Sequence, residues 1–466
     1  MPSFSPKKNI LLVNPWVHDF SAYDFWMKPL GLLYVGSILR SKGARVFILD
    51  FLNGEALPEK YLEGLKPPKR RDFGRGHFYK EVITKPSALQ AIPRLYRRYG
   101  IPPAVMKKAI ADLPRPNLIL ITSLMTYWYP GLFATIIFLK ENFPGVPVLL
   151  GGTYATLCPA HARKYSGADR VLTGPWNGEK MRIVSDYLNG ALEPFEEKFP
   201  SWPFPAFDLY PRLEYVCLLT RCGCPFTCTY CASSKLAPRI ESRTPESIVK
   251  EIIYWRGQWG IQDFAFYDDA LLLDSTVHIL PILQEVNQRN LQVHFHAPNA
   301  LHAGMIDKEV ATILFRGGFK TIRVGLETAS ETRQRETGGK VNNAEFKEAV
   351  RNLKLAGYAG EEIGVYLMAG LPGQRVEEVE ESIAFVKEAG AKSILVEYSP
   401  IPGTPLFEQA KKFSTFDLEE PLWQNNSILP CRWEGFTWED FRRLKKNCGN
   451  RFFPCTRIHE NLGEQR

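Results

Sequence analysis

Short apolar runs alternate with amphipathic segments along the chain up to about residue 189. The apolar runs have the length of buried strands and occupy residues 10–13, 46–49, 118–122, 148–150 and 171–172. Residues 29–40 and 130–142 instead repeat apolar side chains at helical spacing. Strands that alternate with helices indicate βαβ units and a parallel sheet. Residues from about 51 to 116 break the alternation with prolines, glycines and basic clusters, which predicts an elaborated insertion.

A second alternating region follows a proline-rich and aromatic linker at residues 199–211. Its strand candidates are residues 215–220, 264–267, 293–296, 321–325, 364–368 and 393–398. Thr244 before Pro245 predicts a helix start, and Gly357 and Gly390 predict helix ends. Six such βα units predict a parallel barrel or its open arc, with the site at the carboxyl ends of the strands.

These patterns predict an α/β protein of three parts. Residues 1–195 form a Rossmann-like parallel-sheet domain, residues 196–406 a partial (β/α)6 TIM-type barrel, and residues 407–466 a small, mainly helical C-terminal extension. Within the extension, Thr437 is a plausible N-cap for a helix through Lys446. Its aromatic side chains either brace the barrel or close the barrel mouth, and we expect them to close it.

Composition and charge exclude several classes of protein. The 466 residues are 45% hydrophobic and 23% charged, which is typical of globular domains. The longest apolar runs fall far short of the ~18 residues that span a bilayer, so we expect no membrane span. The N-terminus lacks a secretory pattern, and we expect a cytoplasmic protein. The basic run at residues 66–75, within a net charge of +8, suits either an anionic partner or a solvated loop.

Three of the nine cysteines stand close together in the segment CPFTCTYC, namely Cys224, Cys228 and Cys231. Three thiolates from one loop suit a 4Fe-4S cluster and leave one iron open to another ligand. A zinc loop or three unrelated thiols are the alternatives. Zinc sites use four ligands, often in CxxC or Cys/His pairs, and no partner pair occurs elsewhere in the sequence.

With this motif, the chain from residue 215 to about residue 406 resembles the radical S-adenosylmethionine (radical SAM) enzymes. In that family the open iron chelates S-adenosylmethionine, and the reduced cluster cleaves it to a 5′-deoxyadenosyl radical. The stretches YDD, VGLETAS and MAGLPGQ stand where the family contacts this cofactor, although YDD replaces the usual GGE. The resemblance implies S-adenosylmethionine binding by Tyr230, Asp268, Asp269, Glu327, Gly370 and Gly373.

The residues also have structural explanations of their own. The carboxylates follow predicted barrel strands, where they would suit the cationic sulfonium and ammonium groups. Helix capping or a surface turn is the alternative for Asp268 and Asp269. Ordinary turn chemistry of a βα loop is the alternative for Gly370 and Gly373.

The first domain resembles the cobalamin-binding domain that precedes the barrel in one radical SAM subgroup. Glycines and small hydroxyl side chains at the ends of parallel strands suit a flat ligand over the sheet edge. The residues that the resemblance assigns to cobalamin are Asn14, Ser123, Thr126, Tyr127, Gly151, Gly152, Thr153 and Gly174. No DxHxxG motif is present, so we expect base-off binding without a histidine ligand. A domain that kept the fold and lost the cofactor is the alternative.

The resemblance implies an enzyme that uses a 4Fe-4S cluster, S-adenosylmethionine and cobalamin to transfer methyl to an unactivated carbon. Within the enzyme class, a cobalamin-independent or non-methylating radical reaction, such as cyclisation, rearrangement or carbon–carbon coupling, is the alternative. Outside it, the alternative is a cluster-binding sensor. We expect a small-molecule, lipid, tetrapyrrole or peptide substrate, an electron donor such as flavodoxin or ferredoxin, and no nucleic-acid partner. A second cluster from Cys431, Cys448 and Cys455 would match no known spacing.

Overall fold

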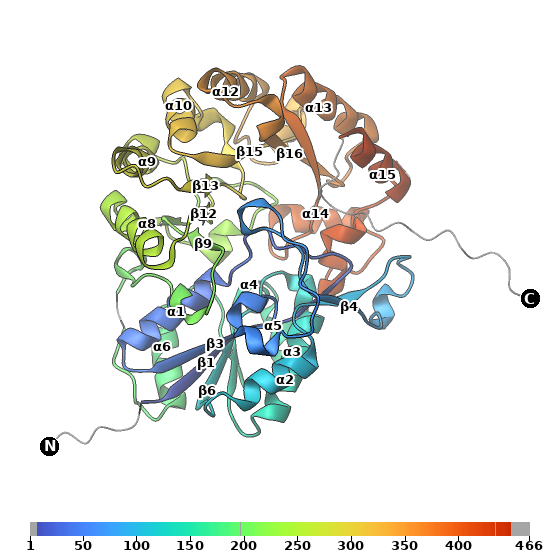
Figure 1. The fold of residues 1–466 in the computed structure, drawn as a ribbon. Coiled ribbons are helices and arrows are strands. Elements are labelled where there is room, and N and C mark those ends of the chain that lie inside the picture. Colours follow the sequence, from blue (N-terminus) through green and yellow to red (C-terminus); the bar gives the residue numbers. More distant parts are fainter. Residues whose placement is uncertain (1–6, 196, 434, 449–466) are drawn as a thin grey trace, which may run out of the picture.

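Two α/β units, one above the other, make up most of the molecule (Figure 1). The computed structural model describes residues 7–195, 197–433 and 435–448. The first unit contains a five-stranded parallel sheet in the order β3-β1-β6-β7-β8. Its strands are β1 (Asn9–Asn14), β3 (Arg45–Asp50), β6 (Leu118–Ile121), β7 (Val148–Leu150) and β8 (Arg170–Val171).

Helices cover both faces of this sheet. Ile10 and Leu12 of β1 belong to one buried cluster, and Leu11 and Val13 to another, because successive strand residues point to opposite faces. The helices of this unit are α1 (Leu30–Ser41), α2 (Pro103–Ala111), α3 (Tyr129–Asn142), α4 (Thr153–Leu157), α5 (Pro159–Tyr165) and α6 (Gly178–Tyr187). The predicted Rossmann-like sheet is confirmed, and its strand order reverses between β1 and β6, where such sheets bind ligands.

The insertion between β3 and β6 has its own structure. Three strands, β2 (Val17–Asp19), β5 (Arg97–Tyr99) and β4 (Lys80–Val82), pair antiparallel in that order. Short 3-10 turns connect them. The sequence did not predict this sheet, because β4 is exposed at all three positions and carries no apolar alternation.

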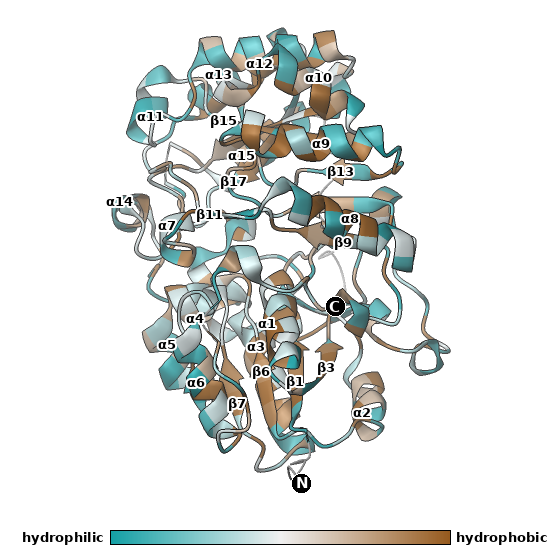
Figure 2. Ribbon diagram, turned by 90° about the vertical axis from the view of Figure 1, so that its left-hand side faces the viewer, coloured by the Kyte–Doolittle hydropathy of each residue, from teal (hydrophilic) through white to brown (hydrophobic). Residues whose placement is uncertain are grey.

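The second unit is an open parallel barrel in the order β17-β16-β15-β13-β12-β9, with β14 paired to β15. Its strands are β9 (Tyr215–Leu218), β12 (Asp263–Phe266), β13 (His294–His296), β14 (Leu301–His302), β15 (Phe319–Glu327), β16 (Ile363–Ala369) and β17 (Lys392–Glu397). The outer helices are α8 (Pro245–Trp259), α9 (Ile279–Gln288), α10 (Lys308–Arg316), α12 (Asn343–Ala356) and α13 (Val376–Glu388). Figure 2 shows these helices stacked along one side of the strands. The predicted partial barrel is confirmed.

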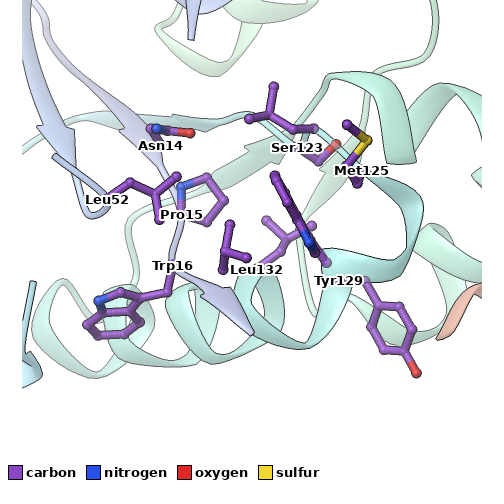
Figure 3. Close-up of a pocket in the computed structure, with 11 residues that line it drawn as sticks. Asn14, Pro15, Trp16, Leu52, Ser123, Met125, Tyr129 and Leu132 are labelled. Carbon is purple, nitrogen blue, oxygen red and sulfur yellow. The ribbon is translucent and has the colours of Figure 1, made fainter. Parts of the chain in front are cut away.

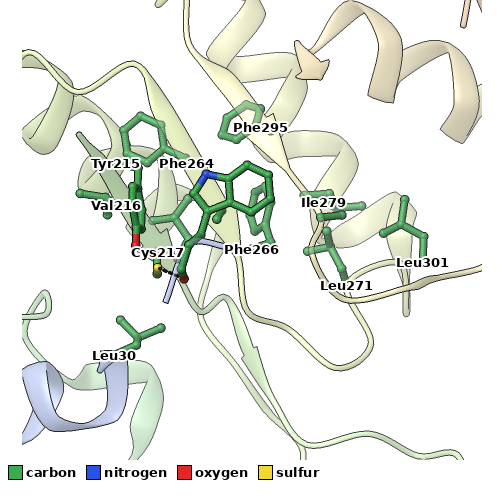
Figure 4. Close-up of a cluster of buried hydrophobic side chains, with 14 of the residues drawn as sticks. Leu30, Tyr215, Val216, Cys217, Phe264, Phe266, Leu271, Ile279, Phe295 and Leu301 are labelled. Atoms are coloured by element: carbon green, nitrogen blue, oxygen red, sulfur yellow. Dashed lines mark hydrogen bonds between the residues drawn. The ribbon is translucent and has the colours of Figure 1, made fainter. Parts of the chain in front are cut away.

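The first unit also fills part of the barrel. Trp26 is fully buried, and its carbonyl oxygen accepts a hydrogen bond from the Cys217 thiol of β9 at 3.4 Å (Figure 4). The hydroxyl of Tyr215 donates to Asp24 at 2.8 Å. The aromatic side chains of β9, β12 and β13 pack around this contact, as Figure 4 shows for Tyr215, Phe264, Phe266 and Phe295.

A small hairpin brackets the cysteine loop at the mouth of the barrel. β10 (Arg221–Cys222) pairs antiparallel with β11 (Glu241–Ser242), and α7 (Ser233–Leu236) lies between them. The short helix α11 (Glu331–Glu336) follows β15. The hairpin with α7 and the helix α11 therefore lie in βα loops, where barrel enzymes place their sites.

The C-terminal extension divides into two parts. α14 (Pro405–Phe413) and the chain to residue 430 lie against loops at the barrel mouth and against the first unit. α15 (Trp438–Asn447) is capped by Thr437, as predicted, and it packs beside α13 and the edge strand β17. The aromatic helix thus covers the open edge of the barrel, and residues 413–430 provide the cover at the mouth. Cys455, Phe452 and Phe453 lie outside the described residues. Within the described ranges, no helix is long and apolar enough to cross a membrane.

Candidate active site

The three cysteines of the motif lie in one loop between β10 and α7. Cys224, Cys228 and Cys231 are free thiols, and each is partly exposed. The Cys231 amide donates to the Cys228 carbonyl at 3.0 Å, which forms a tight turn between these two residues. Neighbouring segments hold this turn from both sides: Thr229 donates its amide to Thr337 at 3.1 Å and accepts from the Leu406 amide at 2.9 Å.

The backbone at Gly338 packs closely against the cysteine loop. Gly338 has φ +122°, and a Cβ atom there would lie 2.9 Å from Cα of Cys228. A side chain at residue 338 would therefore displace the cysteine loop.

The three thiols fit a four-iron cluster better than a single metal ion. No group of three His, Cys, Asp or Glu side chains in the described ranges is gathered closely enough to hold one ion. A cluster takes one thiolate on each of three separate irons, and this loop offers three unpaired thiols. Burial raises the pKa of Cys224 and of Cys228, and Lys340 opposes this rise at Cys228.

Glu327 connects the cysteine loop to the end of β15. Its Oε1 accepts a hydrogen bond from the Tyr230 hydroxyl at 2.9 Å and forms an ion pair with Nζ of Lys340 at 2.5 Å. All three side chains are largely buried, and the Lys340 ammonium lies 6.0 Å from the centre of the Tyr230 ring. Two of the residues predicted to bind S-adenosylmethionine, Tyr230 and Glu327, thus lie together.

The backbone at Glu327 is strained. Its φ is +64°, in the left-handed region, and the pairing of β15 with β16 shifts register between Gly325 and Glu327. A residue other than glycine in this region costs about 1–3 kcal/mol. The bulge turns the carboxylate toward the cysteine loop at the carboxyl end of the barrel.

The two aspartates after β12 have different surroundings. Asp268 is buried and accepts hydrogen bonds from the amides of Thr220 and Arg221 and from the Thr220 hydroxyl. Burial raises its pKa to about 6. Asp269 is exposed and accepts from the Ser233 hydroxyl at 2.8 Å, and that hydroxyl lies 3.2 Å from the Cys231 sulfur. Asp269 is therefore the aspartate connected to the cysteine loop, whereas Asp268 fixes the end of β9.

The glycine loop after β16 lies under the C-terminal extension. Gly370 and Gly373 both have positive φ, and a Cβ at these positions would meet Leu429 at 2.7 Å and the Phe413 ring at 3.3 Å. Gln374, fully buried, accepts from the Gly370 amide at 3.0 Å. These glycines allow the loop and the extension to pack closely; their contact with S-adenosylmethionine stays a prediction.

The ends of β1 and β6 surround a small pocket in the first unit (Figure 3). The pocket is about 10 Å³, room for about one water molecule, and Asn14 and Ser123 line it. The Asn14 amide donates to Asp50 at 2.8 Å, while its Oδ1 is buried without a partner. An unpaired polar atom at the point where the strand order reverses fits a ligand site.

The other predicted cobalamin residues lie along the same sheet edge. Gly152 has φ +91°, and the Thr153 amide donates to Ser123 at 2.8 Å. Gly174 has open space around it, as a flat ligand requires. Thr126 and Tyr127 are buried, and Tyr127 donates to Asn426 of the extension at 3.2 Å. The space beside Gly151 and Gly174 suits a corrin, whereas Gly152 is required by its own loop, because a Cβ there would lie 2.4 Å from the Ser123 carbonyl oxygen.

Sequence reasoning missed three polar side chains of the site, Lys340, Ser233 and Gln374. Lys340 lies in the loop before α12, and nothing in its neighbours indicates a site. Ser233 follows the motif by two residues, and Gln374 ends the stretch GLPGQ, so proximity to a motif was the one available signal.

Comparison with known proteins agrees with this geometry. Residues 219–386 match the family model of the radical SAM superfamily. The chain is 26% identical over 266 residues to an uncharacterized methyltransferase of Pyrococcus horikoshii, covering 54% of this chain and 53% of that protein. It is 20% identical to cytidylyl-2-hydroxyethylphosphonate methyltransferase of Streptomyces wedmorensis, and this match covers 92% of this chain and 87% of that protein.

A solved structure shares the fold of nearly the whole chain. The radical S-adenosylmethionine methyltransferase TsrM from Kitasatospora setae, solved with cobalamin and a 4Fe-4S cluster, superposes with a TM-score of 0.63. The sequences are 17% identical, and the match covers 88% of this chain and 79% of TsrM. The matched residues 219–386 contain the cysteine loop, Glu327 and the glycine loop after β16. It spans about half the length of its Pyrococcus relative.

Proposed function

We propose that the chain is a cobalamin-dependent radical SAM enzyme that transfers methyl to an unactivated carbon. The observation that carries the proposal is the link from the cysteine loop through Tyr230 to Glu327 at the carboxyl end of the barrel. Cys224, Cys228 and Cys231 would hold the cluster. When bound and reduced, a four-iron cluster supplies the electron that breaks a carbon–sulfur bond of S-adenosylmethionine.

The residues of the site would orient S-adenosylmethionine and exclude water. Glu327 and Asp269 place carboxylates where a sulfonium or ammonium group would be stabilised. The ion pair with Lys340 and the hydrogen bond from Tyr230 hold the Glu327 carboxylate in place. The loop at Gly370 and the extension over it cover the barrel mouth, which keeps water from reactive groups.

The sheet edge of the first unit would hold cobalamin. Asn14 offers an unpaired oxygen, and Gly151 and Gly174 leave room for a flat ring, while Gly152 lets its own loop pack closely against Ser123. His161 of α5 is engaged with the Tyr154 hydroxyl at 2.6 Å. We therefore expect base-off cobalamin with no histidine bound to cobalt.

Anaerobic reconstitution with iron and sulfide tests the cluster and the cleavage. The wild-type chain should bind one four-iron cluster and form 5′-deoxyadenosine from S-adenosylmethionine with a strong reductant. Changing Cys224, Cys228 and Cys231 to Ala should abolish both. A triple Ala variant that keeps the cluster and still forms 5′-deoxyadenosine contradicts the proposal.

Two further measurements separate methyl transfer from the alternatives. Methyl transfer from S-adenosylmethionine leaves S-adenosylhomocysteine, so this product should form only in protein loaded with hydroxocobalamin. Formation of 5′-deoxyadenosine alone, with no retained corrinoid, would favour a cobalamin-free or non-methylating radical reaction. Cluster loading without any cleavage would favour a sensor. We also propose a cytoplasmic location, with flavodoxin or ferredoxin as the electron donor.

A further inference from the structure

Several side chains on the inner wall of the barrel, on β15, β16 and β17, are partly exposed. On β15 and β16 the residues Ile322, Val324 and Val365 face the helices and are fully buried. The alternate residues face inward, and several of them are partly exposed, in contrast to the outer face. These inward, partly exposed residues are Arg323, Tyr366, Met368, Ile394 and Val396.

Arg323 is the one charged residue among these five. Its Nη1 donates to the carbonyl of Ile322 at 2.8 Å, and the neighbouring Tyr366 side chain also interacts with the guanidinium. Gly364 makes room for it on the neighbouring strand, because a Cβ at residue 364 would lie 2.7 Å from Nη1 of Arg323. The pKa of Arg323 is lowered, chiefly by burial.

A second arginine approaches from the insertion of the first unit. Phe73 and Gly74 both adopt positive φ and turn the basic run of residues 66–75 toward the barrel. The guanidinium of Arg75 lies 5.3 Å from the Trp26 ring and 5.7 Å from the Phe73 ring. Trp26 in turn stacks on His296 of β13 at 4.5 Å, so Arg75 stands at the inner wall of the barrel.

The two guanidinium groups have no acidic partner in contact. Within the described residues, no carboxylate oxygen lies within 4.0 Å of Arg75 or Arg323, whereas Arg70 of the same basic run pairs with Asp24 and Glu214. The nearby Asp263 carboxylate is engaged with His294 and His296 at 3.1 Å each. The positive charge of Arg75 contributes to the lowered pKa of Arg323. Two like charges held near each other in partial burial are relieved by an anion.

We propose that Arg323, supported by Arg75, binds the carboxylate or phosphate group of an otherwise apolar substrate inside the barrel. Met368, Ile394 and Val396 supply apolar wall, and the planar guanidinium binds such oxyanions through two parallel hydrogen bonds. Arg323 precedes Glu327 by four strand residues, about 13 Å along β15 at ~3.3 Å per residue. The substrate would thus anchor its anionic end deep in the barrel and present an apolar carbon near the cysteine loop. This inference rests on the proposed function for the reaction.

Binding of a simple amphipathic anion tests the site without turnover. Octanoate and 1-octanol are titrated calorimetrically into the anaerobically reconstituted full chain at low salt. Octanoate should bind more tightly than 1-octanol, and Arg323→Met should weaken octanoate binding about tenfold or more while leaving 1-octanol unchanged. Arg323→Lys should fall between, because an ammonium makes no paired contact.

Matched variants separate the site from general charge and folding effects. Arg351→Met removes an exposed arginine of α12, paired with Glu348, and should leave octanoate binding unchanged. Gly364→Ala keeps Arg323 but displaces its guanidinium and the Ile394 side chain, so it should weaken octanoate binding as well. Circular dichroism and cluster absorbance confirm folding. If Arg323→Met does not fold, the octanoate affinities of Gly364→Ala and Arg323→Lys are compared with that of the wild-type chain instead.

Two results would overturn the inference. One is equal affinity of the wild-type chain for octanoate and 1-octanol, and the other is unchanged octanoate affinity in folded variants at Arg323 and Gly364. Either can occur while S-adenosylmethionine is cleaved normally, so failure here is distinguishable from failure of the proposed reaction. If octanoate binds as expected but S-adenosylmethionine is not cleaved, the proposed function is contradicted and the anion site is not.

Discussion

The Tyr230 hydroxyl donates a hydrogen bond to Glu327 at 2.9 Å, although the two residues are 97 positions apart. Tyr230 immediately precedes the third cysteine, and Glu327 ends β15. This hydrogen bond therefore joins the cysteine loop to the carboxylate at the end of β15, so two separately predicted parts of the site are in direct contact.

Tyr230→Phe should weaken S-adenosylmethionine binding while leaving the cluster in place. The change removes one hydrogen bond to a charged group, worth about 1.5–3 kcal/mol, and leaves the ring and the cysteines unchanged. We expect the dissociation constant for S-adenosylmethionine to rise about tenfold, measured by equilibrium dialysis of reconstituted protein. Tyr358→Phe, which loses a hydrogen bond to Phe319 away from the site, is the control. Unchanged affinity in Tyr230→Phe would contradict a role for Glu327 in binding S-adenosylmethionine.

Lys340→Met should destabilise the fold more than the double variant with Glu327→Gln. The single change leaves a buried carboxylate without its cation, which costs about 3–5 kcal/mol, whereas the double change removes both charges. Urea unfolding of both variants and of Glu327→Gln gives the coupling free energy by a double-mutant cycle. A coupling near zero would mean that the ion pair at 2.5 Å contributes nothing to stability.

The strands could be predicted from sequence because both faces of each sheet are covered. A strand buried on both sides reads as a continuous apolar run, and β7 was expected and found at residues 148–150. The antiparallel sheet of the insertion gave no such signal: β2 pairs with β5 about 80 residues away, and every residue of β4 is exposed. Its pairing follows from tertiary packing.

The site could be predicted only where its residues stand in a recognisable motif, as the cysteines, Tyr230 and Glu327 do. The cysteines share one loop, so their spacing carries the information. Lys340 reaches Glu327 only through the fold, and no pattern marks it. The sequence also did not distinguish Asp268, which accepts backbone amides, from Asp269, which reaches the cysteine loop through Ser233. The adjacent loops decide which way each of these carboxylates faces, and the sequence around β12 does not show this.

Asp268 should make stability decrease with pH. Burial raises its pKa from 3.8 to about 6, so between these values the folded chain binds the proton more tightly than the unfolded chain. Its contribution is full below about pH 4 and is lost as the pH rises through 6. The free energy of unfolding of cluster-free protein, measured in urea from pH 4.5 to 7, should fall more steeply in wild type than in Asp268→Asn. Parallel curves would contradict this assignment.

Gly152→Ala should destabilise the first unit far more than Gly145→Ala. Both glycines have positive φ, but a Cβ at residue 152 would lie 2.4 Å from the Ser123 carbonyl, while residue 145 has open space. We expect a loss of at least about 2 kcal/mol at residue 152 and of about 1 kcal/mol at residue 145, from thermal unfolding. Retention of hydroxocobalamin should fall only in Gly152→Ala. Equal losses would mean that the sheet edge relaxes around the added methyl group.

Asn425 of the extension should be the most sensitive point of its contact with the first unit. Its amide donates to Asp19 at 2.7 Å between two buried side chains, and burial already raises the pKa of Asp19. Asn425→Ala removes that donor and should cost about 1–3 kcal/mol. Asn425→Asp has the same shape but places a second carboxyl group beside Asp19, so its loss at pH 7 should be larger. Thermal unfolding of the two variants makes the comparison. If Ala costs as much as Asp, shape rather than charge holds the extension over the sheet edge.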